Sequence, residues 1–172
     1  MSKDNKTPKT MGERLRALRK KKGLSQESLS MEIGIARGLI SMYEKDQIVP
    51  SLTNATYLAQ FYKVSIDDIL GRKTPSGAFL TEEDLIPFES LGEQLLYLRK
   101  TRRLTRSQVS EITGLHANTI LAYETDRCIP NVINAECLAI AYQVPVDYIA
   151  GIYRVQKETP AENKRVTMRI SL

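Results

Sequence analysis

Few residues in this 172-residue sequence are of the types that bind metals or carry out catalysis. Its only cysteines are Cys128 and Cys137, and its only histidine is His116. A structural zinc site normally uses four such ligands, and three candidates are too few. The sequence also shows no acid paired with a base, no nucleophile motif and no phosphate-binding glycine loop. We therefore predict a protein that is not an enzyme and that uses no metal and no cofactor.

The overall charge indicates a polyanionic partner. The chain carries 25 Lys and Arg against 20 Asp and Glu, a net charge of +5, and a basic surface attracts polyanions. No apolar run approaches the ~18 residues that a membrane span needs. The basic N-terminus, MSKDNKTPKT, is not followed by the apolar stretch of a secretory signal. Two unpaired thiols fit a reducing compartment, so we predict a cytoplasmic protein with no membrane segment.

Two eleven-residue stretches, 80 positions apart, share Ile, Tyr, Glu, Asp and Pro at the same spacing. Residues 40–50 are ISMYEKDQIVP and residues 120–130 are ILAYETDRCIP. Aligned without a gap, the segments around them share 23 identities over 61 positions, which indicates a duplicated domain. We predict domains at 11–71 and 91–151, a basic N-terminal arm at 1–10, a linker at 72–90 and a C-terminal tail at 152–172. The alternation of apolar and polar residues at the end of the tail could form a strand.

Each copy carries the start and stop signals of short helices. Thr10 and Ser90 each stand three residues before a glutamate, which is the capping box that begins a helix. Gly34 and Gly114 stand where a left-handed C-cap would end a later helix. The next helix of the first copy is expected at Ala36–Lys45. Neither copy shows the sustained alternation of a strand, so we predict an all-α fold with about five helices per copy.

The middle of each copy resembles a known DNA-binding motif. Residues 23–51, GLSQESLSMEIGIARGLISMYEKDQIVPS, resemble the phage-repressor (Cro-like, xenobiotic-response-element type) helix-turn-helix family. This resemblance, carried by both copies, implies two tandem five-helix, lambda-repressor-like helix-turn-helix domains. The first copy departs from the family pattern at Ala36, where a serine cap is usual, and at Asp46, where a glycine is usual. The second copy departs at Arg106, His116 and Leu121.

In a helix-turn-helix motif the second helix enters the major groove of DNA. Its outward side chains are then the candidates for contact with bases. Arg37 could donate two hydrogen bonds to a guanine, and Asn118 could pair with an adenine. Leu121 could meet a thymine methyl or mark a surface that no longer touches DNA. The full candidate sets are Ala36, Arg37, Gly38 and Ser41 in the first copy, and His116, Ala117, Asn118 and Thr119 in the second.

The resemblance also implies residues with positioning roles. Phosphate contacts carry over to Gln26, Lys45 and Gln47 in the first copy, and to Arg106 and Arg127 in the second. Such contacts set affinity and register rather than sequence preference.

Two structural ion pairs are implied in the same way, Arg19 with Glu44 and Arg99 with Glu124. In the family this pair ties the recognition helix to the first helix of the domain. A guanidinium can bind a carboxylate through two parallel hydrogen bonds, so the repeated Tyr-Glu pair is expected to fix the angle of the recognition helix.

Charge is not shared evenly between the copies. Residues 11–71 carry a net charge of +2 and residues 91–151 a net charge of 0. The first copy is therefore the better match to a phosphate backbone. Its basic residues cluster in and just after the first expected helix, at Arg14, Arg16, Arg19, Lys20, Lys21 and Lys22.

The sequence thus predicts a sequence-specific DNA-binding transcriptional regulator, a repressor, with double-stranded DNA as its partner. A linker of 19 residues could span roughly 24 Å, so one chain could imitate a repressor dimer; a homodimer is the other arrangement. Two alternatives stay open. In one, the first domain alone binds DNA and the second is a protein-interaction or dimerisation module. In the other, the chain is an antitoxin-like component whose main partner is a protein.

Overall fold

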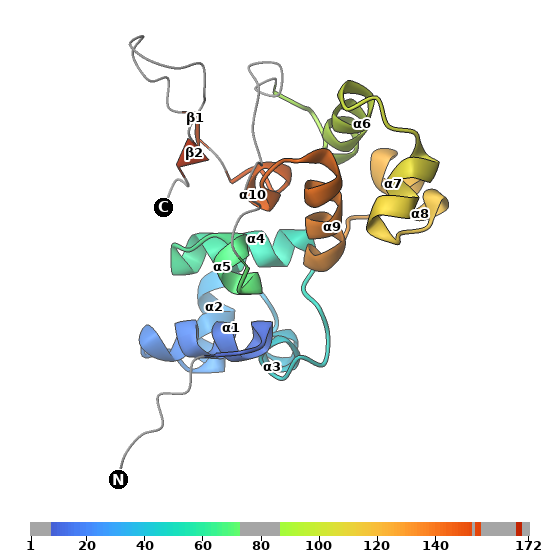
Figure 1. The fold of residues 1–172 in the computed structure, drawn as a ribbon. Helices are drawn as coiled ribbons and strands as arrows, with labels where there is room; N and C mark the ends of the chain where they lie inside the picture. The colour runs from blue at the N-terminus through green and yellow to red at the C-terminus, as the bar shows by residue number, and fades with distance from the viewer. Residues whose placement is uncertain (1–7, 73–86, 153, 156–167, 170–172) are drawn as a thin grey trace.

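The computed structural model describes residues 8–72, 87–152, 154–155 and 168–169. Within them the chain forms ten helices (Figure 1). We call residues 8–72 the first half and residues 87–152 the second half. The first half contains α1 (Met11–Lys21), α2 (Gln26–Ile33), α3 (Arg37–Glu44), α4 (Leu52–Tyr62) and α5 (Ile66–Leu70). The second contains α6 (Leu91–Thr101), α7 (Arg106–Thr113), α8 (Ala117–Glu124), α9 (Val132–Tyr142) and α10 (Val146–Ile149), and each begins 80 residues after its counterpart.

Side-chain caps begin the first helix of each half. Thr10 accepts a hydrogen bond from the Glu13 N–H, and the Glu13 carboxylate accepts one from the Thr10 N–H, which completes the predicted capping box. Ser90 accepts from the Glu93 N–H in the same way. The Glu93 carboxylate accepts from the N–H of Glu89 at 2.8 Å, as the Glu13 carboxylate does from that of Lys9 at 2.7 Å. Of the two predicted capping boxes, the described bonds complete only the one at Thr10.

The helices α3 and α8, which we call the recognition helices, are shorter than the predicted element. The first recognition helix spans Arg37–Glu44 rather than Ala36–Lys45, because Ala36 and Lys45 occupy its N-cap and C-cap positions. Neither Ala36 nor His116, the N-cap of α8, makes a side-chain capping bond. Gly34 and Gly114 end the preceding helices with φ angles of 68° and 71°, the left-handed C-caps that the sequence predicts.

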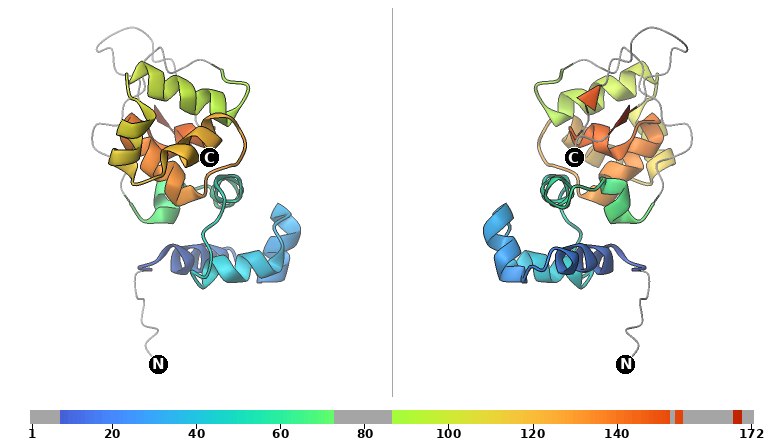
Figure 2. Two further views of the ribbon diagram at one scale, coloured as in Figure 1. Left: turned by 90° about the vertical axis from the view of Figure 1, so that its right-hand side faces the viewer. Right: turned by 90° about the vertical axis from the view of Figure 1, so that its left-hand side faces the viewer.

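The two halves pack against each other through α4 and α5 of the first and α9 and α10 of the second. In the views of Figure 2, α4 and α5 lie between the layer of α1–α3 and the second half. The Leu52 N–H donates to the Pro130 carbonyl at 2.9 Å, and the Val132 N–H donates to the Pro50 carbonyl at 3.0 Å. Because these residues are equivalent in the repeat, the two bonds are related by a local twofold axis. No local pattern in the sequence predicts this junction.

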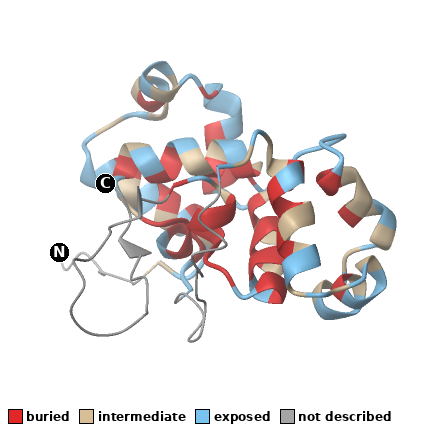
Figure 3. Cartoon of the chain, turned by 90° about the horizontal axis from the view of Figure 1, so that it is seen from above, coloured by how far each residue is buried: buried red, intermediate tan, exposed pale blue. Residues whose placement is uncertain are grey.

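The buried apolar residues of both halves form one continuous core, and they line the inward faces of the helices (Figure 3). In the first half it includes Leu29 and Ile40, which are 1% and 2% exposed, and in the second half their equivalents Val109 and Ile120. Burying one such side chain contributes about 1.5–3 kcal/mol, so each recognition helix is held by apolar packing on one face. No helix in the described residues combines the length and the apolar character that crossing a membrane requires.

A carboxylate is buried at the junction between the halves. Asp147 is 2% exposed, and its Oδ1 accepts a hydrogen bond from the Ile66 N–H of the other half at 3.1 Å. Burial, with a smaller contribution from the charges of Asp67 and Asp68, raises the pKa of Asp147 to about 6 against the lowering effect of that bond. The folded protein therefore holds a proton on Asp147 more tightly than the unfolded chain does.

Replacing Asp147 with Asn should stabilise the chain above pH 6. In the parent, the contribution of Asp147 to the free energy of unfolding should fall as pH rises from about 4 to about 6, because the unfolded state releases this proton first. The carboxamide oxygen can still accept the Ile66 N–H, while the charge that burial disfavours is gone. We expect a gain of up to ~3 kcal/mol at pH 7, measured by urea unfolding. Equal stability of the two proteins at both pH 4 and pH 7 would contradict this.

Two short strands lie beyond the helices. β1 (Arg154–Val155) pairs antiparallel with β2 (Met168–Arg169), with Arg154 opposite Arg169 and Val155 opposite Met168. β2 falls within the alternating stretch of the predicted tail. Most of that tail, and residues 73–86 of the predicted linker, lie outside the described residues.

Candidate nucleic-acid interface

The first recognition helix is fixed to α1 by a buried ion pair. Arg19 Nε donates to Glu44 Oε1 at 2.5 Å and Arg19 Nη2 donates to Glu44 Oε2 at 2.8 Å, the two-bond geometry expected of a guanidinium and a carboxylate. The side chains are only 10% and 4% exposed. Arg19 Nη1 also donates to the Leu24 carbonyl at 2.6 Å, in the turn before α2. One arginine thus links α1, the α1–α2 turn and α3.

Hydrogen bonds keep Glu44 charged despite its burial. Burial acts to raise the pKa of Glu44, but the hydrogen bonds from Arg19 and Gln26 outweigh it and hold the pKa below its usual value. The same pair raises the pKa of Arg19. Both partners therefore stay ionised under ordinary conditions, and the link between the helices persists.

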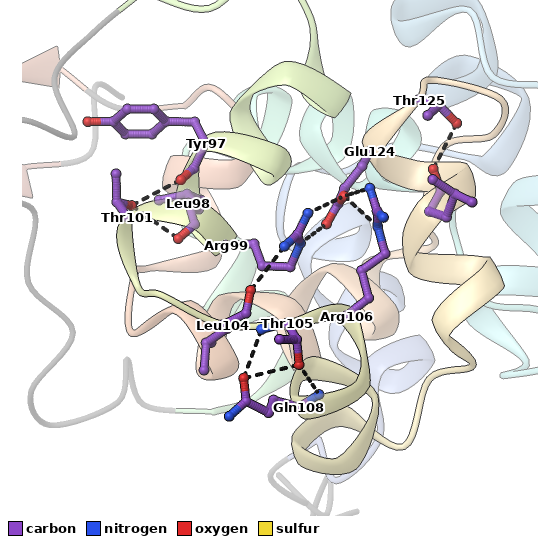
Figure 4. Close-up of polar contacts among 11 residues, drawn as sticks. Tyr97, Leu98, Arg99, Thr101, Leu104, Thr105, Arg106, Gln108, Glu124 and Thr125 are labelled. Atoms are coloured by element: carbon purple, nitrogen blue, oxygen red, sulfur yellow. Dashed lines mark hydrogen bonds and ion pairs between the residues drawn. The ribbon is translucent and has the colours of Figure 1, made fainter.

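The second half repeats this arrangement with an additional cation (Figure 4). Arg99 Nε and Nη2 donate to Glu124 Oε1 and Oε2 at 2.5 and 3.0 Å, and Arg99 Nη1 donates to the Leu104 carbonyl. Arg106 Nε also donates to Glu124 Oε2, at 2.9 Å. Two guanidinium groups share one carboxylate here, so this cluster carries a net positive charge that the first half lacks.

Two of the predicted phosphate-contacting residues belong to these clusters. Gln26 is half-buried and its amide donates to Glu44 Oε2 at 2.9 Å. Arg106 occupies the equivalent place beside Glu124, with its side chain 38% exposed. Both side chains bond to the glutamate that anchors the recognition helix, so their role in the free protein is to support that helix. Contact with a phosphate stays a prediction for both.

The aspartate of the repeated Tyr-Glu-x-Asp stretch has a role that the sequence did not reveal. Asp46 Oδ1 accepts from the Gly12 N–H at 2.8 Å, and Asp46 Oδ2 accepts from the Thr10 hydroxyl at 2.5 Å. It therefore joins the end of α3 to the start of α1, where its negative charge also interacts favourably with the helix dipole. Gly12 allows this approach, because a Cβ there would lie 2.5 Å from the Tyr43 carbonyl oxygen.

The second half contains the same clamp. Asp126 accepts from the Gly92 N–H at 2.8 Å and from the Ser90 hydroxyl at 2.6 Å. Against the family pattern, Asp46 is a departure from glycine. The signal that could have revealed the clamp was its identity in both copies, together with that of the glycines at 12 and 92. Asp46 and Asp126 have φ angles of 55° and 54°, so they adopt the left-handed backbone that the family's glycine would supply.

Replacing Asp46 with Ala should cost more than replacing it with Gly. Both changes remove a capping carboxylate, which is worth about 0.5–2 kcal/mol. Alanine keeps the strained left-handed backbone, which costs roughly 1–2 kcal/mol for a residue with a Cβ, whereas glycine adopts it freely. We expect Asp46→Ala to be the less stable variant by about 1 kcal/mol in urea unfolding. The opposite order would show that the left-handed backbone at position 46 does not decide the difference between the two variants.

The exposed positions of the first recognition helix carry one cation, Arg37, together with Gly38 and the apolar Leu39 and Met42. Arg37 is exposed, and its Nε lies 3.6 Å from Glu27 Oε2 in a solvent-exposed pair, with side chains 66% and 55% exposed. Such a pair contributes about 0–1 kcal/mol and leaves Arg37 available. A Cβ at Gly38 would meet no protein atom within 4 Å, so no contact in the described protein requires glycine there. Of the other candidates, Ala36, Lys45 and Gln47 are exposed and Ser41 is half-buried.

The outward face of α8 is less exposed and carries no cation. Asn118 is exposed at its first turn, beside the exposed N-cap His116. Arg127 is exposed after the end of the helix. The remaining positions of this face, Ala117, Thr119 and Leu121, are half-buried. The two recognition helices therefore present different chemical groups.

Part of the basic cluster of the first half is engaged within the protein. Arg14 donates to the Ile69 carbonyl at 3.0 Å, Arg19 forms the buried ion pair, and Lys22 Nζ lies 4.6 Å from the centre of the Phe61 ring. Arg16, Lys20 and Lys21 are exposed. The charge available to a phosphate backbone is therefore smaller than the sequence count indicates.

The residues that could bind a metal do not come together. Within the described part of the chain, no group of three or more His, Cys, Asp and Glu is placed to hold a metal ion. Cys128 is exposed and Cys137 is half-buried, and both are free thiols.

Comparison with known proteins places a helix-turn-helix at this site. Residues 12–74 match the family described as "Helix-turn-helix domain". The match covers the first half of the chain, which is therefore similar to a helix-turn-helix domain. The chain is also 44% identical over 59 residues to a Bacillus subtilis (strain 168) protein named "Uncharacterized HTH-type transcriptional regulator YobD", a match that covers 34% of this chain and 53% of that protein. The chain thus spans about half the length of this relative, and no solved structure matches it.

Proposed function

We propose that the chain is a sequence-specific DNA-binding transcriptional regulator, a repressor, with tandem helix-turn-helix domains at 11–71 and 91–151. One observation carries the proposal. Each recognition helix is anchored from beneath by a buried Arg–Glu pair, Arg19–Glu44 or Arg99–Glu124, and leaves its opposite face in solvent. A rigidly held helix with one face free is what the major groove requires. Such a protein acts in the cytoplasm of a bacterium and needs neither a cofactor nor catalysis.

In this proposal base contacts come from the first turns of α3 and α8. Arg37 is the long cationic side chain of the first face, and Asn118 is the exposed amide of the second. A bidentate contact to a guanine or an adenine discriminates by about 1–3 kcal/mol. Since the two faces differ, the preferred site should consist of two unlike half-sites. Lys45, Gln47 and Arg127 lie just after the recognition helices and would contact phosphates.

A second candidate keeps DNA binding in the first half alone. The face of α8 has three half-buried positions, Ala117, Thr119 and Leu121, and residues 91–151 carry no net charge. In that case the second half would act as an interaction or dimerisation module, and two chains would be needed to cover a palindromic site.

Single substitutions separate the two candidates. On a duplex selected from a random pool by the intact protein, Arg37→Ala should weaken binding by about 1–3 kcal/mol, roughly 5- to 150-fold, and relax the preference at one guanine. Asn118→Ala should do the same at one adenine in the other half-site. Glu27→Ala is the matched control, because it removes the exposed partner of Arg37 without removing the contact to the base. If Asn118→Ala binds as the parent does while Arg37→Ala does not, only the first half contacts bases.

A further inference from the structure

The junction between the halves is nearly twofold symmetric, but its two edges differ in charge. At one edge Arg72 Nη1 of the first half pairs with Glu136 Oε1 of the second. The residues at the equivalent positions of the repeat are Ile152 and Thr56. Ile152 is 5% exposed, and the Thr56 hydroxyl donates to the Leu52 carbonyl of its own helix at 2.9 Å. The two backbone bonds across the junction are equivalent. The side chains at its two edges are not, because one edge has an ion pair and the other has neutral residues.

The buried Glu136 carboxylate needs its ion-pair partner, whereas the exposed Arg72 guanidinium does not. The Glu136 side chain is 6% exposed, whereas that of Arg72 is 54% exposed. Glu136 Oε2 has no hydrogen-bond partner among the described protein atoms. Burial raises the pKa of Glu136, and Arg72 is the group that acts to lower it. A buried carboxylate that loses its cation is strongly destabilising, and an exposed arginine that loses its anion is not.

The consequences for other pairings follow from the repeat. If the second halves of two chains paired through this same surface, Glu136 would face Ile152 at both edges, and two buried carboxylates would lack a cation. If two first halves paired, Arg72 would face Thr56 at both edges, and no ion pair would form. Only a first half with a second half places Arg72 opposite Glu136.

We propose that the Arg72–Glu136 pair makes this surface specific for the unlike half, so that the halves join within one chain and like halves of two chains do not. The surface of α4 and α5 therefore fits α9 and α10. It does not fit the like half of a second copy. This specificity has one consequence for DNA binding, which rests on the proposed function: a single chain presents both recognition helices.

Space around the pair makes a charge-reversal test practicable. A pocket of about 90 Å³ lies beside it, lined by Asp67, Arg72, Glu136, Ala139, Ile140, Val144 and Val146. An arginine at position 136 is longer than the glutamate, and this space can receive it.

The test measures mass and unfolding of the full chain without DNA. We expect the parent to be a monomer of 19.4 kDa by light scattering. Arg72→Glu should lower the Tm by several degrees and shift part of the protein to dimers or larger species. Combining it with Glu136→Arg should restore the monomer and most of the lost Tm. Lys100→Glu makes the same charge change at an exposed site of α6 and should have neither effect.

A second background shows whether Arg72→Glu acts through Glu136 or simply disturbs folding. On a Glu136→Thr background, which copies the residue at the opposite edge, Arg72→Glu should change the Tm far less than it does in the parent. Equal effects on both backgrounds, no rescue by the reversed pair, or a dimeric parent would overturn the proposal. None of these readouts uses DNA, so they leave the proposed function to its own test.

Discussion

Replacing Glu44 with Ala should destabilise the first half by about 3–5 kcal/mol, the cost of breaking a buried ion pair by removing one partner. Water reaches neither partner easily, because the side chains of Arg19 and Glu44 are 10% and 4% exposed. Arg19 would be left under α3 with the Leu24 carbonyl, and Gln26 would lose its acceptor as well.

Glu124→Ala is the matched change in the second half, and we expect a loss at least as large. Two guanidinium groups, those of Arg99 and Arg106, would then face each other without the shared carboxylate. Arg106→Gln copies the residue of the first half and keeps the main pair. Because Arg106 is 38% exposed, this control should cost less than about 1 kcal/mol. Urea unfolding of the full chain measures all three, and alanine variants as stable as the parent would show that the pairs do not hold the recognition helices.

The second large effect concerns salt. Each phosphate that the protein neutralises contributes a slope of about −0.9 to the plot of log affinity against log salt concentration. Five exposed cations are the candidates that we propose for such contacts, namely Arg16, Lys20, Lys21, Lys45 and Arg127. If all five engage, the slope is about −4.5, and affinity falls roughly 500-fold between 50 and 200 mM salt.

Titration of a selected duplex at several salt concentrations measures this slope. Lys45→Ala should make it shallower by about 0.9, while Arg37→Ala at a base-contacting position should weaken binding with less change in slope. An affinity that does not depend on salt would rule out binding to nucleic acid through these residues.

Local signals in the sequence predicted most of the helices, because capping residues and helix-ending glycines form hydrogen bonds with residues only a few positions away. Thr10, Gly34 and Gly114 mark helix ends that the structure contains. The all-helical character of the two halves was likewise predicted. The exact limits of the recognition helix were not, since Ala36 supplies no cap and the helix begins one residue later.

Contacts between distant residues were harder to predict. Gln26 and Arg106 are of the right type to bind a phosphate, and only the packed structure shows that each bonds to a buried glutamate. Asp46 is a mere departure from a family pattern until its carboxylate is seen at the start of α1. Arg72 seemed to belong to a linker, yet it pairs across the junction with Glu136. Each of these depends on how helices pack, which no local pattern specifies.

The most direct test of a single chain with two different recognition helices is the stoichiometry of its complex. A labelled duplex carrying the selected site is held far above the dissociation constant and titrated with the chain. We predict a break at one chain per duplex, on a site made of two unlike half-sites about 34–36 Å apart. A break at two chains per duplex, on a palindrome, would contradict this account.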